Sequence, residues 1–277
     1  MGAIMVNRLI PLPDGRCLDL KARPLVMGIL NVTPDSFSDG GRHNDVARGL
    51  THARQMIADG ADIIDIGGES TRPGHKPVSA EDEAARIAPF IAPLAKESVI
   101  SVDTMKSKVA EAALRAGAQI VNDVWGFQRD PDLARVASEH RAACVLMHNR
   151  EHEDASIDIV EDMLAFLSRS LDIAQRARIP LDRIVLDPGI GFGKTPEQNM
   201  IAVREIARLH ILGCPVLLGA SRKRIIGAVT GRTDPNDRMA GSLALHLLGA
   251  QAGADILRVH DVAPHVDAMK MLAAFRT

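Results

Sequence analysis

Apolar residues recur along the chain in eight short runs of strand length. Short apolar runs of this kind are typical of strands that are buried within a parallel sheet. The candidate strands are residues 25–30, 62–66, 99–102, 119–121, 142–147, 184–186, 216–219 and 256–259.

The segments between these runs have a helical pattern. In the clearest one the apolar residues are three or four positions apart, which places them in one stripe along a helix. They are Ile157, Val160, Leu164, Leu167, Leu171 and Ala174. Strand and helix therefore alternate along the chain.

The ends of several helices are also visible in the sequence. Thr195, Pro196 and Gln198 have the spacing of a capping box with proline in the first helical turn. Three similar junctions place Gly60, Gly117 and Gly253 just before a candidate strand, where glycine closes the preceding helix in a left-handed conformation.

The order of elements predicts an α/β fold of the (β/α)8 TIM-barrel type. Eight βα units without a Pro/Ser-rich linker fit a barrel better than an open doubly wound sheet, so residues 1–277 are interpreted as one domain. Residues 1–24 precede the first strand. Their turn at Asp14 and Gly15 predicts a hairpin-like extension that closes the bottom of the barrel.

Composition restricts the class of partner. The chain is 46% hydrophobic and 25% charged, with a net charge of −2 and a pI near 6.6. It has no basic field for nucleic acid, no apolar run that approaches a membrane span and no recognisable leader, so we expect a cytoplasmic protein. Cys17, Cys144 and Cys214 share no CxxC spacing, which argues against redox or metal chemistry at cysteine.

Almost every candidate strand ends in a polar side chain. In a barrel these ends meet at one rim, where a ring of polar groups predicts a functional pocket. The ring consists of Asn31, Asp65, Asp103, Asn122, Asp123, His148, Asp187, Ser221, Lys223, Arg258 and His260. Asp103, Asn122, Asp187 and Lys223 suit a planar heterocycle, whereas Arg72, Arg258 and His260 suit an anion such as phosphate.

Three less specific interpretations compete with this pocket. Residues 189–195 resemble a nucleotide phosphate loop, but its first glycine would fall at Pro188, which argues against nucleotide hydrolysis. Asp103 alone would be explained as a helix cap, and Asp65 and Asp123 as supporting or capping groups. His148 is interpreted as a solvated loop histidine rather than a metal ligand.

Seven motifs follow one another on successive strand ends: GILNVTPDSFSDGG, DIGGESTRPG, SVDT, VNDV, DPGIGFGK, SRK and RVHDV. From about Leu25 onward the chain therefore resembles dihydropteroate synthase, a bacterial folate-pathway enzyme. The resemblance implies condensation of 6-hydroxymethyl-7,8-dihydropterin pyrophosphate with para-aminobenzoate, giving 7,8-dihydropteroate and pyrophosphate.

The resemblance also implies roles for individual residues. The implied pterin contacts are Asp103, Asn122, Met147, Asp187, Phe192, Gly219, Lys223 and Arg258. The implied aminobenzoate contacts are Thr71, Pro73, Phe192 and Arg224. The implied pyrophosphate contacts are Asn31, Arg72, Arg258 and His260, with Asn31 also a ligand of Mg²⁺. At position 224 many members carry serine, which also binds a carboxylate.

The implied chemistry is dissociative. Positive charge grows on the pterin methylene as pyrophosphate leaves, so cations around the leaving group and a carboxylate near the pterin favour the reaction. The residues expected to be catalytic are Asp103, Asp187, Lys223, Arg258 and His260. The family resemblance further implies a homodimer formed through the later helices.

Two other classes of function remain open from sequence. A pterin-binding, corrinoid-dependent methyltransferase would share the barrel and the pterin contacts but has no use for the anion-binding motifs. A non-catalytic pterin-binding paralogue would have lost at least one of Asn31, Arg72, Lys223 or His260, and all four are present.

Overall fold

The computed structural model describes residues 6–33, 42–70 and 77–276. Its strands are β1 Leu9–Pro11, β2 Cys17–Asp19, β3 Leu25–Asn31, β4 Ile63–Gly67, β5 Val99–Asp103, β6 Ile120–Asp123, β7 Ala143–Met147, β8 Ile184–Asp187, β9 Leu217–Leu218 and β10 Ile256–Val259. Its α-helices are α1 Arg42–Ala58, α2 Ala80–Leu94, α3 Ser107–Arg115, α4 Leu133–Glu139, α5 Ile159–Arg176, α6 Pro196–Arg204, α7 Ile206–Leu209, α8 Arg224–Thr230, α9 Met239–Gln251 and α10 Val262–Arg276. Short 3₁₀ helices are η2 Leu181–Arg183, η3 His210–Leu212 and η4 Pro235–Arg238.

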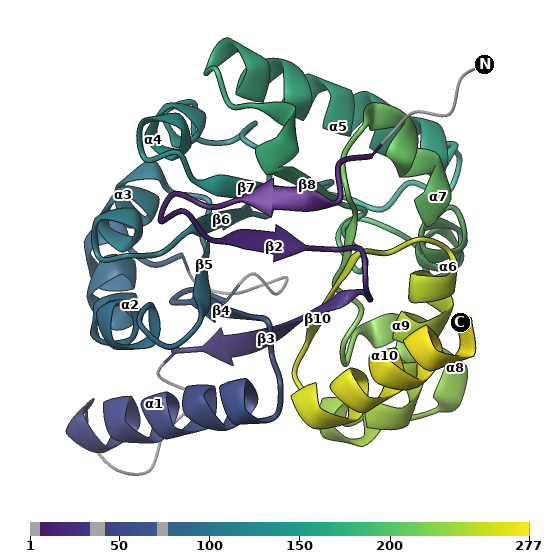
Figure 1. The fold of residues 1–277 in the computed structure, drawn as a ribbon. Coiled ribbons are helices and arrows are strands. Elements are labelled where there is room, and N and C mark those ends of the chain that lie inside the picture. Colours follow the sequence, from purple (N-terminus) through teal and green to yellow (C-terminus); the bar gives the residue numbers. More distant parts are fainter. Residues whose placement is uncertain (1–5, 34–41, 71–76, 277) are drawn as a thin grey trace.

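Eight parallel strands form a nearly closed barrel. Their order is β8-β7-β6-β5-β4-β3-β10-β9, and a parallel bridge between Leu186 and Val216 joins the two ends of this series. The amide of Leu186 also donates to the Pro215 carbonyl at 2.9 Å. The helices surround the strands (Figure 1). The predicted (β/α)8 barrel is therefore confirmed, and each predicted apolar run overlaps one barrel strand.

The helix ends follow the predicted chemistry. Thr195 Oγ1 accepts from the amide of Gln198 at 3.2 Å, and Gln198 Oε1 accepts from the amide of Thr195 at 3.0 Å, so the capping box at α6 is confirmed. Gly60, Gly117 and Gly253 have φ values of 97°, 111° and 111°, in the left-handed region expected for residues that close a helix.

The apolar core has two parts. The larger part lies between the strands and the surrounding helices, and the smaller part lies inside the barrel. The hairpin formed by β1 and β2 contributes Ile10, Leu12, Leu18 and Leu20 to the smaller part. In Figure 1 the hairpin, whose second strand is labelled β2, lies across the ring formed by the barrel strands. The hairpin therefore plugs the amino end of the barrel, as predicted.

The turn at Asp14 and Gly15 determines which hairpin side chains point into the barrel. Ile10 pairs with Leu18 and both are buried, whereas Leu9 pairs with Asp19 and both are exposed. Because side chains alternate along a strand, a shift of one residue would exchange these two faces.

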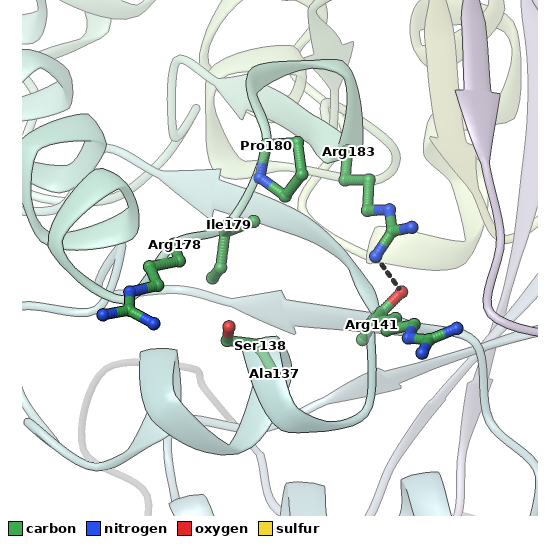
Figure 2. A pocket seen from close by; sticks show the side chains of 8 residues that line it. Ala137, Ser138, Arg141, Arg178, Ile179, Pro180 and Arg183 are labelled. Carbon is green, nitrogen blue, oxygen red and sulfur yellow. Dashed lines mark hydrogen bonds between the residues drawn. The ribbon is translucent and has the colours of Figure 1, made fainter.

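A cavity of about 180 Å³ lies at the same end of the barrel as the hairpin, between the last turn of α4 and the segment that follows α5 (Figure 2). Arg141 and Arg178 follow these helices, and their guanidinium groups lie on opposite sides of the cavity and point away from one another. Arg183 donates to the Arg141 carbonyl at 3.1 Å. The cavity is therefore remote from the rim at which the strands end.

No helix in the described ranges has both the length and the hydropathy of a membrane-spanning segment.

We expect Ile10→Ala to lower the free energy of unfolding by about 2–4 kcal/mol, because it leaves a cavity among packed side chains. Leu9→Ala is the matched control: its side chain is 37% exposed, against 1% for Ile10. Urea unfolding of both variants tests this, and equal effects would contradict the assignment of the hairpin as a plug.

Candidate active site

The carboxyl ends of the strands bring together polar residues that are distant in sequence. The register pairs Asn31 with Gly67, Gly67 with Asp103, and Asp103 with Asn122. A Cβ atom on Gly67 would lie 3.8 Å from both Asn31 Oδ1 and Asp103 Oδ2. Because Gly67 has no side chain, the side chains of Asn31 and Asp103 on either side of it both face the mouth of the barrel.

Arg258 lies between two carboxylates at this rim. Its Nε donates to Asp65 Oδ2 and its Nη2 donates to Asp103 Oδ2, both at 2.6 Å. Asn122 Nδ2 donates to the same Asp65 oxygen at 3.1 Å. Although burial lowers it, the pKa of Arg258 is raised by the two carboxylates. One guanidinium against two carboxylates leaves one excess negative charge when both acids are ionised.

One oxygen of each carboxylate remains available. Asp103 Oδ1 and Asp65 Oδ1 are buried and lack a hydrogen-bond partner within the described residues. Buried acceptors are normally satisfied, so these atoms are candidates to accept N–H groups of a ligand. Burial raises the pKa of Asp103 to about 7, opposed by Arg258 and reinforced by Asp65.

These contacts decide between the two interpretations of Asp103. The helix-cap interpretation is wrong, because α3 begins at Ser107 and its N-cap residue is Lys106. Asp65 is correctly predicted as a supporting group, since it holds Arg258 and Asn122. Asp123 accepts from the amides of Trp125 and Phe127 at 2.8 and 2.6 Å, which confirms its capping role in a loop.

Asp187 is a third buried carboxylate at the rim. Its Oδ1 accepts from the amide of Gly189 at 2.7 Å, and a Cβ on Gly219 would lie 3.6 Å from its Oδ2. Burial raises the pKa of Asp187 to about 6, whereas the Gly189 amide and Lys223 lower it. Met147 is its buried neighbour on β7.

Lys223 reaches back over the loop that follows β8. Its Nζ lies 4.2 Å from the centroid of the Phe192 ring, a cation–π contact. A Cβ on Gly191, whose φ is +84°, would lie only 3.2 Å from Lys223 Cδ. Lys223 therefore lies across the glycine-rich loop, while Arg224 begins α8 with an exposed side chain.

The loops after β9 and β10 are tied to each other. Ser221 Oγ lies 2.9 Å from His260 Nδ1 and accepts from the His260 amide at 3.2 Å. Arg222 forms an ion pair with Asp261 at 2.7 Å. These contacts hold His260 close to the segment that carries Lys223.

A family model described as pterin binding enzyme matches residues 27–260. Dihydropteroate synthase of Bacillus subtilis is 49% identical over 259 residues, which cover 93% of this chain and 90% of that protein. The corresponding enzyme of Clostridium beijerinckii is 47% identical, over 90% of this chain and 93% of that one.

The chain belongs to the dihydropteroate synthases, within the pterin-binding enzyme family.

Solved structures agree with this assignment. Dihydropteroate synthase of Xanthomonas albilineans with 4-aminobenzoic acid superposes with a TM-score of 0.92 at 45% identity, covering 97% of this chain and 99% of that one. The Xanthomonas enzyme in complex with 7,8-dihydropteroate gives a TM-score of 0.87 at 43% identity, covering 96% and 99%.

The predicted contacts Thr71, Arg72 and Pro73 lie outside the described residues. The flanks of their segment are anchored within the structure by Lys106. Its Nζ contacts Glu69, donates to Glu83 Oε2 at 2.6 Å and donates to the Val78 carbonyl at 2.7 Å. The enzyme thus fixes both sides of residues 71–76 to one buried ion-pair cluster.

The structure also contains a second cluster, centred on Lys194, which was not predicted from the sequence. Lys194 is buried, and its Nζ contacts His148 Nδ1 at 2.6 Å, the Gly189 carbonyl at 3.0 Å and the Phe192 carbonyl at 3.3 Å. These three acceptors match the three donors of an ammonium group. Burial lowers the pKa of Lys194 to about 7, opposed by Asp187 and Asp162.

The prediction that His148 is solvated is wrong, because its side chain is fully buried. Since Nδ1 faces Lys194, the ring proton belongs on Nε2, which lies 3.0 Å from Asp162 Oδ2. Burial and the Lys194 charge lower the pKa of His148 to about 3, so the ring is neutral. Arg150 also donates to Asp162 Oδ2, at 2.9 Å.

This Lys194 cluster holds the loop that supplies Asp187 and Phe192. The sequence did contain a signal for this cluster, namely a lysine at the end of a glycine-rich loop and a histidine directly after a buried strand. The mouth of the barrel otherwise unites most of the predicted contacts, namely Asn31, Asp103, Asn122, Met147, Asp187, Phe192, Gly219, Lys223, Arg258 and His260.

We expect Lys194→Met to lower the free energy of unfolding by about 2–4 kcal/mol, because three buried acceptors lose their donor. Lys108→Met is the control, since the Lys108 ion pair with Glu81 is exposed and such pairs contribute about 0–1 kcal/mol. Thermal and urea unfolding measure both changes, and a Lys194→Met variant as stable as Lys108→Met would contradict the cluster's structural role.

Proposed function

We propose that the enzyme condenses 6-hydroxymethyl-7,8-dihydropterin pyrophosphate with para-aminobenzoate to form 7,8-dihydropteroate and pyrophosphate. The observation that carries the proposal is the open acceptor Oδ1 of Asp103, whose other carboxylate oxygen, Oδ2, accepts from Arg258 inside the barrel mouth. The Xanthomonas structures with 4-aminobenzoic acid and with 7,8-dihydropteroate support the two substrate classes.

The pterin would lie across the mouth of the barrel. Asp103 Oδ1 would accept from pterin N–H groups, and Asn122 and Asp187 would add complementary donors and acceptors. Lys223 Nζ would approach the ring from the opposite loop, where it already contacts Phe192. The surrounding wall in this proposal consists of Met147, Phe192, Gly219 and Arg258.

The reaction itself would begin with departure of pyrophosphate. As the carbon–oxygen bond breaks, positive charge grows on the pterin methylene, and the excess negative charge of the Asp65–Asp103–Arg258 cluster stabilises it. Arg72, Arg258 and His260 would bind the leaving pyrophosphate. The aminobenzoate nitrogen would then attack the methylene carbon and form the C–N bond, and its surplus proton would pass to the released pyrophosphate or to water.

The aminobenzoate would occupy the outer side of the pocket. Phe192 would pack against its ring, and Thr71 and Pro73 would cover it. Arg224, whose side chain is exposed at the start of α8, would bind its carboxylate. Holding the weak nucleophile beside the methylene contributes to rate through orientation.

Mg²⁺ fits the rim at Asn31. Its amide oxygen is a hard ligand at the end of β3, and it faces the same space as Asp103 across Gly67. Within the described residues no group of three His, Cys, Asp or Glu side chains forms a metal cage. A magnesium ion at Asn31 would therefore take its other ligands from pyrophosphate and water, and would neutralise charge on the leaving group.

Both alternatives are less well supported. A corrinoid-dependent methyltransferase would not account for the relatives described above, which are dihydropteroate synthases. A non-catalytic paralogue would not need the retained Asn31, Arg72, Lys223 and His260.

The direct test supplies purified enzyme with the pterin pyrophosphate, para-aminobenzoate and Mg²⁺, and measures pyrophosphate and dihydropteroate together. We expect both products in equal amounts. Pyrophosphate without dihydropteroate would exclude the condensation, and no release of either would exclude the proposed activity.

We expect Asp103→Asn to lower kcat by roughly a hundredfold or more, because one preorganised charge beside the developing cation is lost. Asp123→Asn is the control, since Asp123 is also buried but its oxygens accept from loop amides rather than facing the mouth. An unchanged rate for Asp103→Asn would remove Asp103 from the reaction.

The same carboxylates predict the pH dependence. The pKa values of Asp103 and Asp187 are raised to about 7 and about 6, and the proposed reaction needs the ionised forms. We therefore expect kcat/KM to reach its full value about one pH unit above the pKa of Asp103 and to fall as pH decreases through these two values. A profile that stays flat down to pH 5 would contradict this assignment.

We also propose that two chains associate through the later helices. Most of the large apolar side chains that are exposed belong to α8, α9 and α10, namely Val229, Met239, Leu248, Met271 and Phe275. Exposed apolar side chains that gather on neighbouring helices are typical of interaction sites, and α9 contacts both α8 and α10.

Light scattering should therefore give a mass about twice 29.8 kDa, and Leu248→Lys should reduce it to that of one chain. Leu181→Lys is the control, because Leu181 is similarly exposed but lies on η2. A monomeric wild type would refute the homodimer.

We further propose a cytoplasmic location, which is supported by three free cysteines, of which Cys144 and Cys214 are buried. We also propose that the partners of the protein are small molecules rather than nucleic acid.

A further inference from the structure

Two buried histidines connect the loops that carry Lys223 and His260. His246 lies on α9 and His265 on α10, and both side chains are fully buried. Their rings meet edge to face, with centroids 4.9 Å apart and planes at 72°. Nothing in the reaction proposed above uses either ring.

The two imidazoles form a continuous chain of hydrogen bonds between two backbone groups. The Ala220 amide donates to His246 Nε2 at 3.2 Å. His246 Nδ1 lies 2.9 Å from His265 Nε2, and His265 Nδ1 lies 2.6 Å from the Asp261 carbonyl. Ala220 is three residues before Lys223, and Asp261 directly follows His260.

Only one arrangement of protons satisfies every contact in this chain. An amide can only donate, so His246 Nε2 must accept and the His246 proton is on Nδ1. That proton is given to His265 Nε2, so the His265 proton is also on Nδ1. It is given to the Asp261 carbonyl, which can only accept.

A charged ring would break the chain. Protonated His246 would point a second N–H at the Ala220 amide, and protonated His265 would point one at the N–H of His246. Burial lowers the pKa of His246 well below its ordinary value and also lowers that of His265, so the pair is neutral. Of the neighbouring groups, His265 and then His260 lower the pKa of His246, whereas the Leu218 backbone raises it; the pKa of His265 is raised by Asp261 and by the Ser242 backbone.

The location of the pair gives it a role at the site. The ladder between β9 and β10 ends at Leu218 and Leu257, before either loop begins. Beyond that point the loops are joined by side chains: Ser221 with His260, Arg222 with Asp261, and the two histidines beneath them. Of these three links between the loops, the histidine pair is the one in which both side chains are fully buried.

We propose that His246 and His265 are positioning residues, which as a pair of neutral Nδ1–H imidazoles set the separation of the Lys223 loop from the His260 loop. The expected effect on catalysis rests on the proposed function. The assignment of the two tautomers rests only on the hydrogen bonds. The pair replaces the missing strand ladder with a polar link of fixed length between Ala220 and Asp261.

The first experiment needs no substrate. Two-bond ¹H–¹⁵N correlation spectra of the full-length protein, labelled with ¹⁵N-histidine, report the tautomer of each ring at pH 7.5. His246→Gln and His265→Gln assign the two signals. We expect both rings in the Nδ1–H form, which is the minor tautomer of free histidine in water. An Nε2–H form for either ring would overturn the proposal.

The second experiment separates positioning from simple packing. His246→Leu leaves the Ala220 amide without an acceptor, whereas His246→Gln places an amide oxygen where Nε2 was. We expect His246→Leu to lower kcat/KM for the pterin pyrophosphate about tenfold or more, because misplaced groups reduce rate steeply, and His246→Gln to recover part of this loss.

The matched control is His210→Leu. His210 Nδ1 and Nε2 also contact two backbone carbonyls, of Cys214 at 3.1 Å and Gly253 at 3.0 Å, but near the amino ends of β9 and β10. We expect this variant to lose stability without a change in kcat/KM. If His246→Leu and His246→Gln both retain the wild-type kcat/KM, the positioning role is refuted. If the wild type has no synthase activity but both rings are Nδ1–H, the proposed function fails while the link between the loops stands.

Discussion

The site depends on one buried cation shared by two carboxylates. The charge of Arg258 would be costly to bury without Asp65 and Asp103, and two ionised carboxylates would be costly to bury without Arg258. The shared cation holds one oxygen of each acid and leaves the other oxygen open. Removing Arg258 would leave two uncompensated carboxylates in the site, whereas removing either carboxylate would cancel the excess negative charge of the cluster. The same arrangement that stabilises the rim therefore creates the acceptors that a pterin requires.

The barrel makes this arrangement possible because it fixes distances that loops cannot. The strands β4, β5 and β10 carry Asp65, Asp103 and Arg258, whose side chains meet in two ion pairs at the barrel mouth, and the hairpin fills the opposite end with apolar side chains. The loops that follow the strands then need local supports. Lys106 supports the flanks of residues 71–76, Lys194 supports the loop after β8, and the histidine pair joins the loops after β9 and β10.

Most of the fold could be predicted from the sequence because its signals are local. The apolar run before Asn31, the capping box at Thr195 and the turn at Asp14 each specify structure within a few residues. The polar rim was also predictable, since strand ends in a barrel share one face. The resemblance to dihydropteroate synthase then implied which residues contact the substrates at that face.

The contacts between distant residues could not be predicted in this way. Asp103 and Arg258 are 155 positions apart, so the sequence alone left Asp103 open to interpretation as a helix cap. His148 was wrongly expected in solvent because nothing local to it reveals Lys194, 46 positions later, or the register that places its amide 2.9 Å from the Asp187 carbonyl. His246 and His265 resemble ordinary helical residues until α9 and α10 are packed together.

The most direct test of this account is a crystal structure of the enzyme with the pterin pyrophosphate bound and no aminobenzoate present. We predict that a pterin N–H group lies within hydrogen-bonding distance of Asp103 Oδ1, while Arg258 still contacts Asp65. A pterin bound elsewhere, with Asp103 Oδ1 left without a partner, would contradict the central claim that the shared cation prepares this acceptor.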